Sequence, residues 1–208
     1  MHRPVAGIWR VPSEGTGSAL AATAFFFFLG GLAGCVLAAN ISGGGNESLT
    51  AYLEGFLLAA NAGELSVPGT LALFWSVMRW PLFTVVLSFT ALGLIGIPVL
   101  FCARGFLLSF AIASFVRMLG GTGGLLALAV FGVSGVLSIP ALFVLGVQGL
   151  SASRCLAGRA FGETRHVFPF GRDYFLRCGM CMAAFCVCLP LECFAVPVLV
   201  SGIAGLLP

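Results

Sequence analysis

The sequence predicts an all-α fold, a polytopic transmembrane helical bundle with about five spans and an outer amphipathic helix. Three observations carry this prediction: 60% of the 208 residues are hydrophobic, only 8% are charged, and the mean hydropathy is +1.11. A soluble domain has about 25% charged residues, so the composition excludes ordinary globular and disordered proteins. With a net charge of only +3, no nucleic-acid partner is expected. We treat residues 1–208 as a single integral membrane domain in contact with the lipid bilayer.

Each predicted span is an apolar run long enough to cross a hydrocarbon core about 30 Å thick, which takes roughly 20 helical residues. The candidate spans lie near residues 18–39, 80–103, 105–119, 124–150 and 178–207. A turn at residues 120–124 separates the third span from the fourth. The first run, preceded by Arg3 and Arg10, also suits a signal peptide, although its 22 residues exceed the usual apolar region of such peptides.

Arginine positions predict the orientation. If 105–119 crosses the membrane, the N-terminus, a turn at Arg104 and an inner loop at 151–177 share one side. That side then holds eight of the ten basic residues: two before residue 11, Arg104 and five in the loop. The loop arginines are Arg154, Arg159, Arg165, Arg172 and Arg177.

Arginine-rich loops face the cytoplasm. We therefore expect a multi-pass protein of the bacterial cell membrane, with its N-terminus cytoplasmic and its C-terminus outside. The inner loop has two interpretations: a topology determinant that touches anionic lipid, or a docking site for a cytoplasmic partner.

The outer segment, residues 40–79, contains apolar side chains at helical spacing. These are Leu49, Tyr52, Leu53, Phe56 and Leu57, with Glu54 on another side of the helix. The pattern predicts an amphipathic helix on the outer membrane surface. It is either a simple connector or a docking surface for an extracellular partner.

Glu192 is the one acidic residue within a predicted span. An unpaired carboxylate in lipid is costly, so we expect a partner, and Arg117 near the outer end of 105–119 is the candidate. An ion pair, a proton or substrate relay and simple proximity to the outer interface all remain open interpretations.

Small residues four apart, Gly30 with Gly34 and Ser134 with Ser138, predict close helix packing. Packing within the chain is the default interpretation, and a homo-oligomer stays open.

Two similar segments, 93–101 and 135–143, each contain a proline: Pro98 in the first and Pro140 in the second. We expect both segments to run from outside to inside, and both prolines to break their helices. Paired breaks of this kind point to a transporter site.

No catalytic residue, cofactor or metal is predicted. Of the eight cysteines only Cys178 and Cys181 have a metal-ligand spacing, and both histidines lie outside the spans. The sequence has no hydrolytic triad, paired acids or phosphate-binding loop. We therefore expect the protein not to be an enzyme.

Two motifs carry a resemblance to a known family: residues 104–110 (RGFLLSF), and residues 138–142 (SIPAL) followed by Gly146 and Gly149. They resemble the stage II sporulation protein M family. The resemblance implies a membrane scaffold that holds membrane-anchored, extracytoplasmic peptidoglycan hydrolases at the division septum during endospore engulfment. The alternative function is a permease-like transport subunit working with a separate ATPase.

Overall fold

The computed structural model describes residues 13–40, 51, 55, 70–160, 171–195 and 198–199. Its helices are α1 (Ser13–Asn40), α3 (Thr70–Ser88), α4 (Gly93–Ala127), α5 (Val133–Ala160) and α6 (Arg172–Pro190). Two π-helical turns, Leu128–Gly132 and Leu191–Ala195, precede α5 and follow α6. The described ranges contain no strand.

Four helical stretches are long and apolar enough to cross a membrane. They are Thr16–Asn40, Gly93–Arg117, Gly123–Arg159 and Arg172–Ala195. Helix α3 adds a fifth, shorter helix of 19 residues. The prediction of an all-α polytopic transmembrane bundle is confirmed, and the chain is a multi-pass membrane protein.

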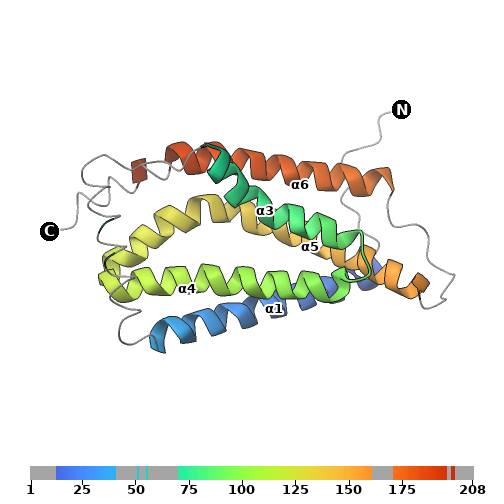
Figure 1. Cartoon of the computed structure of the whole chain (residues 1–208), viewed down its shortest axis with the longest axis horizontal. Helices are drawn as coiled ribbons and strands as arrows, with labels where there is room; N and C mark the ends of the chain where they lie inside the picture. The colour runs from blue at the N-terminus through green and yellow to red at the C-terminus, as the bar shows by residue number, and fades with distance from the viewer. Residues whose placement is uncertain are drawn as a thin grey trace.

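The five helices lie along one long axis and alternate in direction in chain order, so α1, α4 and α6 run parallel to one another and antiparallel to α3 and α5 (Figure 1). The start of α1, the end of α3, the start of α4, the end of α5 and the start of α6 lie at one end of the bundle (Figure 1). The ends of α1 and α6 lie at the opposite end, which we call the far end. The most extensive helix contacts join α1 to α4, α5 to α6 and α3 to α5.

The predicted turn at Arg104 is wrong. The reversal instead occurs at residues 89–92, where the Thr90 hydroxyl donates to the Leu87 carbonyl at 3.0 Å and the Gly93 amide donates to the Thr90 carbonyl at 3.1 Å. Helix α4 then continues through Arg104. The Arg104 guanidinium lies over the Trp80 ring, 5.3 Å from its centroid. Because this cation–π contact stabilises the charge inside the bundle, Arg104 does not have to lie at a turn.

The boundaries of the other predicted segments also shift. Within the predicted inner loop, residues 151–160 and 172–177 are helical, because α5 continues to Ala160 and α6 begins at Arg172. The turn expected at residues 120–124 is present as a kink at Gly120, whose φ of 59° and ψ of −134° favour glycine.

Pro98 and Pro140 lie inside continuous helices, so the predicted breaks at these prolines are wrong. The interruptions are the Gly120 kink and the π-helical turn Leu128–Gly132. A π-helical turn bends a helix by adding one residue to the turn, and the chain arches there between α4 and α5 (Figure 1).

The two similar segments run in opposite directions, which corrects the predicted common direction. Phe101 packs edge-on against Phe143 with ring centroids 5.0 Å apart, and its ring also lies against Gly146. Ile97, one turn earlier in α4, lies against Gly149, later in α5. The first segment, 93–101, forms the beginning of α4, and the second, 135–143, lies in α5. The two segments run in opposite directions because α4 and α5 are antiparallel.

The apolar core lies where α3, α4, α5 and α6 meet. Its buried members include Met78, Ile97, Phe101, Leu142, Leu150 and Phe185. On α1 the large side chains Phe25, Phe28 and Leu32 point away from the bundle and are 61–68% exposed. In a membrane protein such an outward apolar surface is solvated by lipid.

Candidate functional site

The α1–α4 contact is a close, parallel helix seam made by glycines. A side chain at Gly30 would overlap the backbone carbonyl of Cys102, and one at Gly34 would overlap that of Phe106. From the other side, Gly105 faces the carbonyl of Phe27. The Gly30–Gly34 pair therefore packs within the chain, as its spacing predicts.

Four of the five predicted loop arginines are described, and they gather at one end of the bundle. Arg154 and Arg159 lie in the last turns of α5, and Arg172 and Arg177 lie in the first turns of α6. Arg154 donates to the Ser18 hydroxyl of α1 at 2.7 Å, which joins α5 to α1 at this arginine-rich end. Arg165 lies outside the described residues.

Two cations share one indole ring within the bundle. The guanidinium groups of Arg79 and Arg104 lie 5.4 and 5.3 Å from the centroid of the Trp80 ring. Sequence reasoning missed this arrangement because it assigned Arg104 to a turn. The available signal was the 25-residue apolar window Gly93–Arg117, in which Arg104 falls near the middle.

Glu192 does not pair with Arg117, which instead donates through Nη1 to the Ala38 carbonyl at 2.5 Å. The Glu192 carboxylate is close enough to Arg104 for a favourable charge interaction, but the two described side chains form no ion pair. Glu192 is half-buried in the π-helical turn after α6. One turn earlier, the Cys188 thiol points to the Ser134 carbonyl at 3.8 Å, which places this side of α6 against α5.

Polar side chains also occupy the interior near the arginine-rich end. Ser88 and Tyr174 share a hydrogen bond of 2.6 Å between α3 and α6, and Ser153 donates to the Leu87 carbonyl at 3.4 Å. The Gln148 amide is buried and has no hydrogen-bond partner among the described residues. A buried amide without a partner costs about 1–3 kcal/mol, so Gln148 is a polar position that packing alone does not explain.

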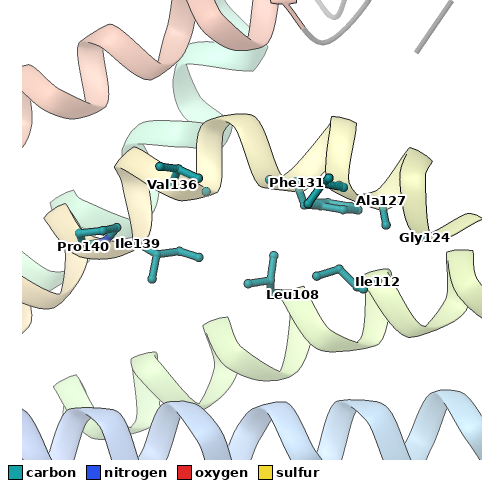
Figure 2. A pocket seen from close by; sticks show the side chains of 11 residues that line it. Leu108, Ile112, Gly124, Ala127, Phe131, Val136, Ile139 and Pro140 are labelled. Carbon is teal, nitrogen blue, oxygen red and sulfur yellow. The ribbon is translucent and has the colours of Figure 1, made fainter. Parts of the chain in front are cut away.

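Two open apolar grooves run along α4. One lies between α1 and α4, has a volume of about 400 Å³ and ends at Arg117. The other has a volume of about 450 Å³ and separates α4 from the arched chain that leads into α5. Figure 2 shows Leu108 and Ile112 on one wall of the second groove and Phe131, Val136 and Ile139 on the other.

The predicted docking residues Leu49, Tyr52, Leu53, Phe56 and Leu57 lie outside the described residues. Between them, Ala51 and Gly55 are described, and both are helical and exposed. Helix α1, which precedes the segment with the docking residues in the sequence, ends at Asn40 at the far end (Figure 1).

The described residues contain no group of three potential metal ligands, and all eight cysteines are free thiols. Cys178 and Cys181 pack with Leu145 in a small apolar cluster between α5 and α6. These two thiols therefore act as small buried side chains.

The comparisons with known proteins give one match. The model of the family described as stage II sporulation protein M matches residues 23–203. No curated protein matches the chain, and no solved structure matches it. The family match begins within α1, extends past the π-helical turn that follows α6, and includes both motifs that resemble the family. The chain belongs to the stage II sporulation protein M family, a family of membrane-associated sporulation proteins.

Proposed function

We propose that this chain is a non-enzymatic membrane scaffold that recruits and holds peptidoglycan-degrading partners at the septal membrane during endospore engulfment. Family membership supports the sporulation role. The side of the membrane proposed for the partners rests on one observation, the uneven distribution of arginines between the two ends of the bundle. Arg154, Arg159, Arg172 and Arg177 lie at one end, together with the start of α1.

This asymmetry has a consequence for the outer segment. Since arginine-rich ends face the cytoplasm, the arginine-rich end is assigned to the inside and the far end to the outside. The segment after Asn40 then emerges on the extracytoplasmic side, where peptidoglycan lies. Its stripe of Tyr52, Leu53 and Phe56 is the proposed docking surface for membrane-anchored hydrolases.

Co-purification tests the scaffold directly. A tagged chain recovered from sporulating cells after mild crosslinking is expected to enrich membrane-anchored peptidoglycan hydrolases at least tenfold over an equally abundant, tagged multi-pass protein. The physical reason is that a scaffold forms complexes stable enough to survive solubilisation. Recovery of no hydrolase, or of an ATPase in their place, contradicts the proposal.

A second candidate function is a transport subunit that works with a separate ATPase. Two charges within candidate spans favour it: Arg104, which lies over the Trp80 ring, and Glu192, which has a favourable charge interaction with Arg104. Charged residues inside membrane spans often mark a substrate or ion pathway. The buried Gln148 amide adds a polar group to the same bundle.

Arg104→Gln separates the two functions. For a scaffold, the variant is expected to keep both hydrolase recovery and engulfment within about twofold of the wild type. It loses the cation–π contact with Trp80, which contributes about 2 kcal/mol when desolvated, and the favourable charge interaction with Glu192. For a transporter, engulfment is expected to fall more than tenfold while hydrolase recovery is unchanged.

The matched control for this comparison is Arg172→Gln, which removes an exposed arginine at the arginine-rich end. The comparison requires that both variants fold equally well, which is checked by thermal unfolding in detergent. A defect shared by both variants would assign the effect to overall charge and remove the support for transport.

A further inference from the structure

We infer that the surface of α4 around Ile112 binds one anionic glycerophospholipid, with its phosphate on Arg117 and one acyl chain in each of the two grooves. The first groove is lined by Cys35, Ala38 and Ala39 of α1 together with Ser109, Ala113 and Val116 of α4. The second is lined by Leu108 of α4 and by residues of the arched chain from Gly124 to Pro140.

Ile112 is the ridge between the two grooves. It lines both of them, and its side chain is 37% exposed. A single ridge with a trough on each side matches a molecule with two chains joined at one end. The volumes of about 400 and 450 Å³ are similar, as the similar chains of one lipid require.

The length of the grooves along α4 is close to the thickness of one membrane leaflet. Residues 108–116 of α4 extend about 12 Å at 1.5 Å per residue, whereas half of a typical hydrocarbon core is about 15 Å. Arg117 follows immediately, three residues before the Gly120 kink at the far end of α4. The grooves therefore lie in the leaflet opposite the arginine-rich end, with the cation at the headgroup level.

Arg117 provides the charge complementarity. Its bond to the Ala38 carbonyl holds the guanidinium at the mouth of the α1–α4 groove. A guanidinium has five N–H donors, so this one bond leaves donors for a phosphate, which arginine binds in bidentate fashion. No acidic side chain is among the described residues that line either groove. An anionic headgroup is thus favoured over one that carries a compensating ammonium.

A helix from a second copy fits this surface less well. An α-helix with its side chains is about 10–12 Å across, so it would rest on the Ile112 ridge and leave both troughs unfilled. Voids of this size forfeit the packing contacts that drive helix association in lipid. Flexible acyl chains can enter both troughs.

Native mass spectrometry tests the site. The purified full chain, in micelles containing equal amounts of phosphatidylglycerol and phosphatidylethanolamine, is expected to retain one phosphatidylglycerol with about a tenfold preference. Arg117→Gln is expected to remove that preference because one charge-assisted contact is lost. Arg172→Gln, at the opposite end, is expected to keep it. An unchanged preference in Arg117→Gln, or a second copy of the chain in place of the lipid, overturns the inference.

A second variant tests the two-chain geometry without altering charge. A Cβ at Gly124 would lie 3.9 Å from Cγ2 of Val116, an ordinary contact, so Gly124→Leu fills the second groove without a clash at Cβ. We expect it to weaken retention of phosphatidylglycerol at least fivefold and to leave single-chain lysophosphatidylglycerol unaffected. Equal retention of both lipids by wild type and variant overturns the assignment of the second chain. Thermal unfolding without added phosphatidylglycerol checks that both variants fold.

Discussion

Replacing Tyr52, Leu53 and Phe56 with aspartate is expected to abolish recovery of peptidoglycan hydrolases and to leave the transmembrane bundle folded. The three residues belong to the apolar stripe of the outer segment. Carboxylates on that stripe would have to be desolvated at a partner interface, at a cost of several kcal/mol each. Hydrolase recovery should therefore fall at least a hundredfold.

The measurement is co-purification from sporulating cells, with the thermal unfolding temperature of the purified variant as the check on folding. Glu54→Gln is the matched control, because Glu54 lies on another side of the predicted helix. It is expected to retain full recovery. Normal recovery of hydrolases by the triple variant would remove the docking role from this segment.

Gly30→Leu is expected to prevent stable assembly of α1 with α4. Its Cβ would overlap the Cys102 carbonyl, and backbone atoms cannot rotate away as a side chain can. Overpacking a core costs about 1–3 kcal/mol, and a clash with backbone in the tightest helix seam should reach or exceed the upper value. Membrane proteins with a loosened span are degraded, so the amount of folded protein should drop sharply.

Gly179→Leu is the matched control for this experiment. A Cβ at Gly179 meets nothing within 4 Å, and the residue lies exposed on α6. Denaturation in mixed micelles is expected to show a large loss of stability for Gly30→Leu and almost none for Gly179→Leu. Equal stability of the two variants would mean that α1 and α4 do not meet through Gly30.

The aspartate and glycine variants alter different parts of the chain and therefore separate partner binding from folding. The glycine seam concerns the bundle alone, since Gly30 and Cys102 lie within spans. The aspartate variant concerns the predicted outer segment, which follows the end of α1 at Asn40 in the sequence. A scaffold requires both: a stable membrane anchor and a surface presented outside it.

Much of the architecture was predictable because lipid imposes simple rules. Apolar length determines which segments can span, and the spans that this rule predicts near residues 18–39, 124–150 and 178–207 overlap the long apolar helices α1, α5 and α6, with different boundaries. It misplaced the reversal between α3 and α4, because the apolar run from Trp80 to Val116 is interrupted only by Arg104. Length and charge alone cannot locate a turn inside such a run.

The candidate sites depended on contacts between segments far apart in the sequence. Nothing near Arg104 in the chain indicates that it shares the Trp80 ring with Arg79, since that ring belongs to another helix. Likewise, the partner of Arg117 is the Ala38 carbonyl and not Glu192. Backbone carbonyls carry no sequence signal, so this pairing was invisible to pattern reasoning.

Composition and residue pattern alone determined that this protein resides in lipid as a helical bundle, that arginines gather toward one end and that Gly30 and Gly34 mark a close helix contact. Only the tertiary structure decided where the chain reverses, which cation Glu192 acts upon and how α4 comes to have a groove on each side of Ile112. The physical reason is that burial in lipid depends on the average polarity of a segment. Charge pairing and groove shape depend on which side chains of distant helices meet.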